Sequence, residues 1–319
     1  MLPPFRVGSG VCVLASGARC LYRIRIPLHV TGLWVPVWRG SPRETGSLGA
    51  GLLLEPPAVA EVYECPGGEC GLRVRACGEL VSASTSIVKH VVELLGGLNV
   101  DVSLESPAPL AVGYAVSAAI ALAIAIGEGS RRGWSVEASA AVAHEAEVLA
   151  GTGLGDVVAM VYGRGLELRL APGAPGLARV ESFPVNAKTI YSLELGRMAT
   201  TEMHRALGEK LVALAAPRWQ RIAENPNLDT FLREAREFSV EAGFAPDWLR
   251  EKLDRLVSRG LVRGWYVKKR VAIVVPEDDA AGEAREELEA LAAKRGLRLR
   301  RHRPAGSPLS VEPCYSSFM

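Results

Sequence analysis

The chain has 319 residues, 49% of them hydrophobic, which is enough for one large core or two ordinary ones, and we expect two domains. A formal net charge of +2 is too balanced for a protein held on nucleic acid or anionic lipid by bulk charge, so a small molecule is the expected partner. No apolar run reaches the roughly 18 residues that would cross a bilayer, and we expect a soluble cytoplasmic protein with no membrane partner.

The six cysteines are too sparse for a secreted disulfide scaffold, and their spacing does not match a zinc finger. Cys65 and Cys70 enclose the stretch "CPGGEC", which is most simply a turn that bears two thiols. A bridge between them is the alternative. The chain has one glutamine and far more arginine than lysine, a composition typical of heat-adapted proteins, in which intracellular disulfides are less unusual.

The first part of the chain alternates between strand and helix patterns. Residues 22–64 predict a strand, a glycine-bearing turn and a second strand. Residues 81–97 have apolar side chains at helical spacing, and residues 100–111 alternate like a half-buried strand. Two small-residue helices are predicted next, over 116–129 and 135–151, the second with Ser135 as its cap and Gly151 as its stop.

Residues 151–176 predict a glycine turn, a short helix and a strand, after which prolines and glycines mark a break. We place a domain boundary near residue 180, so the expected domains are 1–180, with residues 1–20 as an extension, and 181–319. The second domain is expected to be an α+β unit. Its predicted elements are helices at 229–244, 246–260 and 281–296 and strands at 270–275 and 297–303.

The stretch "PLAVGYAVSAA", residues 109–119, joins a predicted strand to a predicted helix. Backbone N–H groups at a helix start favour phosphate oxygens, and Gly113 would let the backbone approach them closely. Ala111 and Ala115 stand at flanking positions where glycines would be expected, and we expect both to adopt ordinary backbone angles. Ser117 could offer its hydroxyl to a phosphate or to magnesium. A structural helix start with a capping serine is the alternative.

Two acids follow in "AHEAEVLAGTGLGDVVA". Glu147 falls in the last turn of a predicted helix, and Asp156 lies just after the glycine turn. One carboxylate can bind a cation while the other orients or deprotonates a hydroxyl nucleophile. Glu145 points from a different helical face than Glu147. A solvated surface acid and, for Asp156, a helix N-cap are the alternatives.

Three stretches in this order resemble the GHMP kinase superfamily of small-molecule kinases and, within it, archaeal pantoate kinases. They are "PLHVTGLWVPVWRGSPRETGSLGAG", "PLAVGYAVSAA" and "AHEAEVLAGTGLGDVVA" with its trailing "PGAPG". The resemblance covers residues 23–180 and extends to the helical part of the second half. It implies an α+β, two-domain GHMP kinase-like fold, with an N-terminal ribosomal-protein-S5-like α/β domain and a C-terminal α+β domain.

The resemblance also implies roles for individual residues. Asp156 would be catalytic, and Ser117 and Glu147 would hold Mg²⁺. The ATP site would include Pro109, Gly113, Tyr114, Ala115, Val116, Ser117 and Ala118. The acceptor pocket would include His29, Thr31, Gly46, Ser47 and Gly49. The implied reaction is ATP-dependent phosphorylation of pantoate to 4-phosphopantoate in coenzyme A biosynthesis, carried out by a homodimer.

Three departures from the family pattern matter: Leu28 replaces a glycine after Pro27, and Ala111 and Ala115 replace glycines in the phosphate loop. A further weakness is that Lys268, Lys269 and Arg270 stand where a small-residue or glycine-rich turn would be expected. These cations could approach a phosphate or form a solvated edge, and we favour the solvated edge. Rival functions remain open: a kinase for mevalonate, homoserine or shikimate, or a kinase fold that has lost catalysis. A DNA-binding regulator is another, since residues 238–270 also read as a winged helix-turn-helix.

Overall fold

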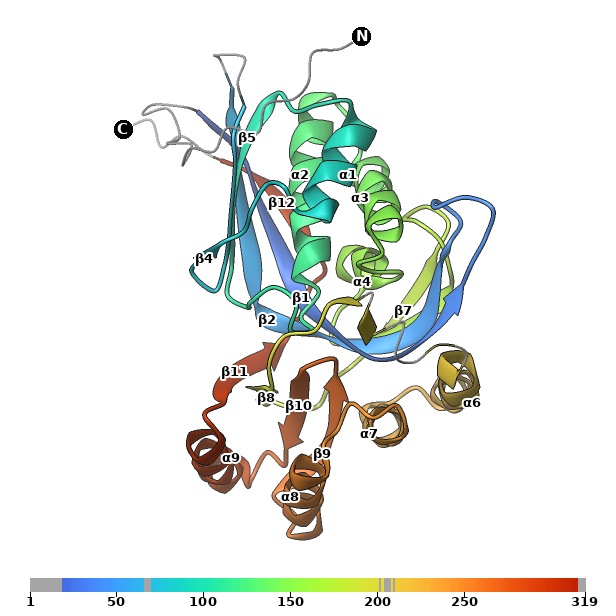
Figure 1. Cartoon of the computed structure of the whole chain (residues 1–319), viewed down its shortest axis with the longest axis vertical. Helices are drawn as coiled ribbons and strands as arrows, with labels where there is room; N and C mark the ends of the chain where they lie inside the picture. The colour runs from blue at the N-terminus through green and yellow to red at the C-terminus, as the bar shows by residue number, and fades with distance from the viewer. Residues whose placement is uncertain (1–18, 66–69, 201, 204–207, 209, 315–319) are drawn as a thin grey trace.

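Two long antiparallel strands, β1 and β2, run through the centre of the molecule (Figure 1). The computed structural model describes residues 19–65, 70–200, 202–203, 208 and 210–314. Strand β2 pairs on its edges with β1, β5, β6 and β11, so it joins most of the N-terminal sheet. The strands of this part are β1 Cys20–Val37, β2 Gly46–Glu64, β3 Leu72–Ala76, β4 Glu79–Leu80, β5 Val100–Ser106, β6 Leu166–Ala171 and β7 Arg179–Phe183.

Helices α1, α2 and α3 pack together on one side of this sheet, and the short helix α4 lies near their lower ends (Figure 1). Helix α2 is buried along almost its whole length, because its many alanines let the sheet and the other helices approach closely. Ser135 caps α3 by accepting from the Ala138 amide, and Gly151 ends it in the left-handed region, as predicted. The helices are α1 Ser86–Leu95, α2 Val116–Arg131, α3 Val136–Ala150 and α4 Asp156–Tyr162.

The C-terminal strands form the order β11, β8, β10, β9, with α7, α8 and α9 beyond them in Figure 1. Strand β11 pairs with β2, and β12 returns to β1, so the chain closes on its first strands. The proposed division near residue 180 falls inside β7 and stays a prediction. The elements are α6 Lys210–Glu224, α7 Leu228–Glu241, α8 Asp247–Ser258, α9 Ala281–Arg295, β8 Ile190–Glu194, β9 Val262–Lys268, β10 Val271–Pro276, β11 Arg298–Pro304 and β12 Ser310–Pro313.

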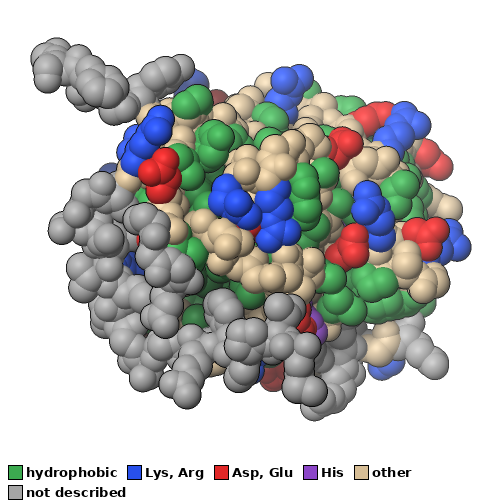
Figure 2. Space-filling model, turned by 90° about the horizontal axis from the view of Figure 1, so that it is seen from above, with side chains coloured by type: hydrophobic (Ala, Val, Ile, Leu, Met, Phe, Trp, Pro, Cys, Tyr) green, Lys and Arg blue, Asp and Glu red, His purple; other side chains and the backbone are tan. Residues whose placement is uncertain are grey.

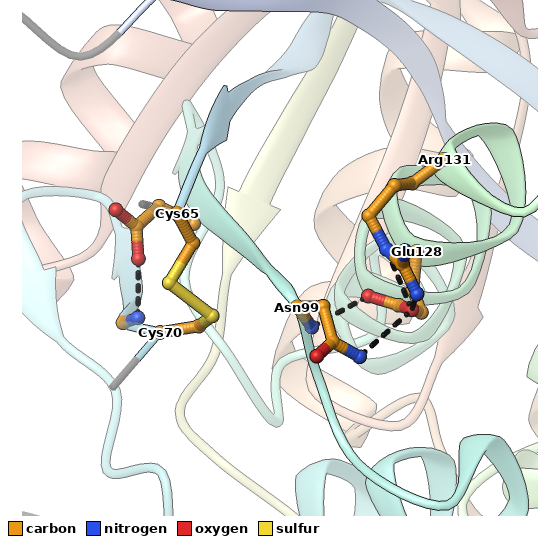
Figure 3. Close-up of a disulfide and its surroundings, with 7 residues drawn as sticks. Cys65, Cys70, Asn99, Glu128 and Arg131 are labelled. Carbon is orange, nitrogen blue, oxygen red and sulfur yellow. Dashed lines mark hydrogen bonds and ion pairs between the residues drawn. A yellow bond between two sulfur atoms is a disulfide. The ribbon is translucent and has the colours of Figure 1, made fainter. Parts of the chain in front are cut away.

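Cys65 and Cys70 form a disulfide, so the two-thiol interpretation is wrong and its alternative is correct (Figure 3). A second disulfide joins Cys20 to Cys314, which lie on the paired strand β1 and directly after β12. No local pattern indicates this pairing, because the two cysteines are 294 residues apart in the sequence. Beside the first disulfide, the buried Glu128 carboxylate accepts hydrogen bonds from Asn99 and Arg131 and fixes the end of α2.

The surface carries both signs of charge. On the face seen in Figure 2, Lys and Arg side chains alternate with Asp and Glu rather than gathering into one basic patch. Residues 1–18, most of the predicted N-terminal extension, lie outside the described residues. Within the described part of the chain, none of the helices combines the length and the apolar character that crossing a membrane requires.

Candidate active site

Asp156 begins α4 and faces two side chains of β1. Its Oδ1 lies 2.7 Å from His29 Nδ1, and Thr31 Oγ1 donates to the same oxygen at 3.3 Å. His29 and Thr31 are two residues apart on β1 and therefore point to the same face of the strand. The helix N-cap is Gly155, so Asp156 is free of the capping role that was its structural alternative. Its side chain is 21% exposed.

His29 bridges two carboxylates. Its Nε2 lies 3.0 Å from Glu167 Oε1 on β6, and both His29 and Glu167 are fully buried. Gly51 makes this arrangement possible, because a Cβ there would lie 2.4 Å from His29 Nε2. Burial opposes the charged imidazolium, but the hydrogen bonds to Asp156 and Glu167 outweigh it and raise the pKa of His29.

Asp156 is held as an anion. Burial works against its charge, but the hydrogen bond and charge of His29, together with the cations Lys268 and Arg169, lower the pKa of Asp156 well below its usual range. A carboxylate that is so stable as an anion is suited to orienting a hydroxyl by accepting its hydrogen bond. It is a weak base for early removal of the proton.

Glu147 lies in the last turn of α3 and is 1% exposed. Thr152 Oγ1 donates to its Oε1 at 2.6 Å, whereas its Oε2 is buried with no hydrogen-bond partner. Burial and the nearby Asp156 charge raise the pKa of Glu147 to about 7, against the opposing influence of the Thr152 and Ser117 hydroxyls. An orphaned buried carboxylate oxygen next to a serine hydroxyl fits a Mg²⁺ ligand pair, which phosphates and water would complete.

Gly153 keeps the two acids close. A Cβ at this position would lie 2.1 Å from Glu147 Oε2 and 3.1 Å from Asp156 Oδ2. The glycine turn after α3 therefore lets both carboxylates face the same space, and any larger residue would have to displace one of them. Among the described residues, no cluster of three or more His, Cys, Asp or Glu side chains could hold a metal alone.

Two alanines in the loop before α2 have left-handed backbone angles that the sequence does not predict. Ala111 has φ +64° and Ala115 has φ +57°, so the expectation of ordinary backbone angles is wrong at both positions. The loop is pinned from two sides: Met198 N donates to Ala111 O, and Arg270 N donates to Val112 O. These tertiary hydrogen bonds hold a conformation that alanine disfavours by roughly 1–2 kcal/mol.

Gly113, at the centre of this loop, has φ +139° and packs on the β9–β10 turn. A Cβ there would lie 2.8 Å from Lys268 O and 2.7 Å from Val271 Cγ1. The glycine is thus required by conformation and by close approach together. The same contact brings the turn over the start of α2.

Lys268 and Lys269 lie at this turn and point into the molecule, so their interpretation as a solvated edge is wrong. Lys268 Nζ lies 3.1 Å from the centroid of the Trp34 ring, and Lys269 Nζ donates to Thr200 Oγ1 at 2.5 Å. Two helices followed by a β-hairpin do occur, as a winged-helix unit would have. The cations at the hairpin tip, however, face a cavity instead of an open surface.

One cavity of about 370 Å³ is lined by Asp156, Ser117, the loop before α2 and the lysines of the β9–β10 turn. The structure therefore brings the turn after α3 and the loop before α2 together. The predicted site residues that line the cavity are Thr31, Ser47, Gly113, Tyr114, Ala115, Val116, Ser117 and Asp156.

Other predicted site residues lie behind the cavity wall. His29 and Glu147 reach it through Asp156 and Ser117. Gly46 and Gly49 make room for neighbours, since Cβ atoms there would lie 2.4 Å from Gly173 N and 2.3 Å from Arg169 Nη2. Pro109 and Ala118 are buried outside the lining residues.

Sequence reasoning missed Arg169, whose guanidinium lines the cavity although its side chain is only 1% exposed. It is paired with Glu167, and its Nε is buried without a hydrogen-bond partner. The stretch "LELRL" on β6 held a usable signal, because Glu167 and Arg169 are charged residues two apart on a strand that is otherwise apolar.

Comparison with known proteins finds similar kinases. Residues 82–164 match the GHMP kinases N terminal domain. The chain is 28% identical over 249 residues to a pantoate kinase of Thermococcus kodakarensis, covering 74% of this chain and 82% of that protein.

Among solved structures, a phosphotransferase related to the CoA biosynthesis pathway has a TM-score of 0.79 and 25% identity, covering 93% of this chain and all of the other. A complex of MDDEF with MVAPP, AMPPCP and magnesium shares the fold at a TM-score of 0.65 and 11% identity, with 92% and 100% coverage. Residues 82–164 thus match the N-terminal domain of the GHMP kinases, and most of the chain is similar to pantoate kinases.

Proposed function

We propose that the protein is a pantoate kinase, which transfers the γ-phosphoryl group of ATP to the primary hydroxyl of pantoate and yields 4-phosphopantoate and ADP. The observation that carries the proposal is the shared cavity. Asp156, the Ser117–Glu147 pair and the amide-bearing loop before α2 all face it or support its wall. Phosphoryl transfer depends mainly on positioning and charge neutralisation, and this constellation supplies both.

The nucleotide side is the start of α2. Its first amides have no partner within the helix, and the helix dipole makes this end favourable for phosphate. Ser117 and Glu147 would hold Mg²⁺, and the orphaned Glu147 Oε2 is the group that needs a cation. Bound there, Mg²⁺ would neutralise phosphate charge and fix the orientation of the triphosphate.

The acceptor side is formed by Thr31, Trp34, Ser47, Asp156 and Arg169. Pantoate carries a carboxylate, two hydroxyls and a branched dimethyl carbon. The Arg169 guanidinium, with its unpartnered Nε, suits the carboxylate. Asp156 would accept the hydrogen bond of the attacking hydroxyl and take up its proton as the new O–P bond forms.

Homoserine, another acceptor within the superfamily, is distinguished from pantoate by its charge. Homoserine adds an ammonium group, which would meet Arg169 and both hairpin lysines, whereas pantoate brings only a negative charge to these cations. The same cavity disfavours the DNA-binding alternative, because the basic hairpin tip is turned inward. We also expect a cytoplasmic homodimer.

The deciding experiment measures ADP release by the purified chain with ATP and pantoate, with and without Mg²⁺. Mevalonate, homoserine and shikimate serve as competing acceptors under the same conditions. We expect Mg²⁺-dependent turnover that is at least tenfold higher in kcat/KM for pantoate than for the other three. Equal or greater turnover with another acceptor would replace pantoate, and salt-sensitive DNA binding without ATP turnover would favour the regulator.

A further inference from the structure

Two lysines at the β9–β10 turn lie in the cavity without a salt bridge to a carboxylate. Among the described residues, the Lys268 ammonium rests on the face of Trp34, and Lys269 donates to the Thr200 hydroxyl. The charge of Asp156 attracts both ammonium groups, but its carboxylate is held by His29 and Thr31. An anion that enters the cavity would give the two lysines a direct partner.

The backbone of the β9–β10 turn is strained. Lys269 has φ +52°, and it is one of four non-glycine residues with positive φ in the described chain. Two of the others, Ala111 and Ala115, belong to the loop against which the turn packs. Strained backbone that persists in three places around a single cavity points to a function that requires this shape.

The two ammonium groups address different sides of the cavity. Lys269 donates to Thr200, whose hydroxyl donates to Thr152 O, and Thr152 in turn donates to the Glu147 carboxylate. Lys268 rests on the ring of Trp34, which lines the acceptor side with Arg169. Lys269 therefore lies toward the magnesium acid, and Lys268 lies toward the acceptor.

Burial weakens both charges when no ligand is bound. Loss of hydration lowers the pKa of Lys268, and the neighbouring cations Lys269 and Arg169 add to this effect against the opposing charge of Asp156. Burial likewise lowers the pKa of Lys269. Phosphate oxygens would reverse this imbalance, since they bring negative charge and hydrogen-bond acceptors at the same time.

We propose that Lys268 and Lys269 form a phosphate clamp with divided roles, which rests on the proposed kinase function. Lys269 binds the terminal phosphates of the nucleotide in its ground state. Lys268 binds the phosphoryl group while it passes to the acceptor hydroxyl. The β9–β10 hairpin thus contributes charge to the reaction, although the loop before α2 contributes the amides.

Binding of Mg²⁺ and the non-hydrolysable analogue AMPPCP, measured by titration calorimetry, tests Lys269 without any acceptor. We expect Lys269→Met to weaken this binding about tenfold, the effect of losing one charge-assisted hydrogen bond. Lys269→Asn is the second variant, because asparagine tolerates the left-handed backbone while it removes the ammonium group. Equally weak binding by both variants supports the clamp. Wild-type affinity in Lys269→Asn would overturn it, since the backbone alone would then explain the loss.

Turnover tests Lys268. We expect Lys268→Met to lower kcat about 100-fold while the affinity for MgAMPPCP stays within threefold. The reason is that Lys268 contacts the phosphoryl group only during its transfer to the acceptor. Arg270→Met is the matched control: it removes a cation from the same turn, but the side chain does not line the cavity. Unchanged kcat in Lys268→Met, or an equal loss in Arg270→Met, would overturn the proposal. Thermal unfolding of each variant separates these results from misfolding.

Failure of the clamp and failure of the proposed function are distinguishable. If wild type phosphorylates pantoate and both lysine variants match it, the clamp is wrong and the function stands. If wild type does not use pantoate but Lys269→Asn still weakens MgAMPPCP binding, the acceptor is wrong and the nucleotide role of the turn is supported.

Discussion

His29 Nδ1 lies 2.7 Å from Asp156 Oδ1, and this contact joins the first strand of the fold to the start of α4 across 127 residues. The imidazole is fully buried, and Glu167 holds its other nitrogen, so the ring cannot turn away. His29 therefore determines both where the Asp156 carboxylate points and how strongly it holds its charge. It acts on the reaction through Asp156 and is a positioning residue.

Replacing His29 by asparagine should keep a hydrogen bond to Asp156 and remove the positive charge. We expect the pKa of Asp156 to rise toward its usual range, so the acidic limb of the pH profile of kcat/KM should move to higher pH. Turnover at neutral pH should fall about tenfold. An unchanged acidic limb with lower kcat would show that His29 acts only on structure.

The same variant has a signature in the pH dependence of stability. The pKa of His29 is raised from 6.5, so its contribution is fully present below about pH 6.5 and is lost as the pH rises through the folded-state pKa. The pKa of Asp156 is lowered from 3.8, so its contribution is present above about pH 4 and is lost as the pH falls. We expect the wild-type advantage in urea unfolding to be largest between these limits and to shrink in alkaline solution.

Replacing Asp156 by asparagine should separate chemistry from nucleotide binding. Asparagine keeps the size of the side chain but cannot take up the hydroxyl proton, so kcat should fall about 10²–10⁴-fold. Affinity for MgAMPPCP should be unchanged or tighter, because an acid near the phosphates is lost. Steady-state kinetics and calorimetry measure the two effects, and wild-type turnover would remove Asp156 from the mechanism.

Local patterns in the sequence predict much of this fold. The Ser135 cap and the Gly151 stop are encoded by neighbouring residues, and both were predicted correctly because capping needs only short-range hydrogen bonds. The turn from Gly151 to Asp156 and the helix after Gly113 follow for the same reason. These local units also carry the family motifs, so the candidate site could be recognised from sequence.

Long-range packing explains what could not be predicted. The left-handed φ of Ala111 lies in a segment held by hydrogen bonds from residues far along the chain, since Met198 N donates to Ala111 O and Arg270 N donates to Val112 O. Likewise, nothing near Lys269 in sequence indicates that the hairpin tip turns inward onto Gly113. The acceptor side depends on Arg169, whose burial results from its pairing with Glu167 and from the absence of a side chain at Gly49.

Glu147 should lower stability when no metal is bound. Its pKa is raised from 4.5 to about 7, so the folded state loses stability as the pH rises through this interval, and the full penalty is present above about pH 7. At pH 8 in EDTA, the free energy of unfolding of Glu147→Gln, measured in urea, should therefore exceed that of wild type by on the order of 2 kcal/mol. Near pH 4 the two proteins should be equally stable.

Glu145→Gln is the matched control for this measurement. Glu145 lies on the same helix, is 24% exposed and pairs with Arg43 at 3.7 Å, so we expect no gain at pH 8. Glu147→Gln should also raise the Mg²⁺ concentration needed for half-maximal turnover, because the carboxylate ligand is lost. A variant no more stable than wild type at pH 8, with an unchanged Mg²⁺ requirement, would contradict the assignment of Glu147 as an unsatisfied metal ligand.

In the loop before α2, replacing the native alanine by glycine should increase the stability of the protein at two positions. Ala111→Gly and Ala115→Gly relieve a left-handed conformation that costs alanine about 1–2 kcal/mol, against about 0.5–1 kcal/mol for the extra freedom of glycine in the unfolded chain. Each should raise the free energy of unfolding by about 0.5–1 kcal/mol. Ala118→Gly, the same change at a helical and fully buried position of α2, should instead destabilise by about 1 kcal/mol.

MgAMPPCP affinity should be retained in both loop variants, because the tertiary hydrogen bonds at Ala111 O and Val112 O already hold the loop in shape. Urea unfolding and calorimetry measure the two quantities, and destabilisation of both loop variants to the same extent as Ala118→Gly would mean that these alanines are not under backbone strain.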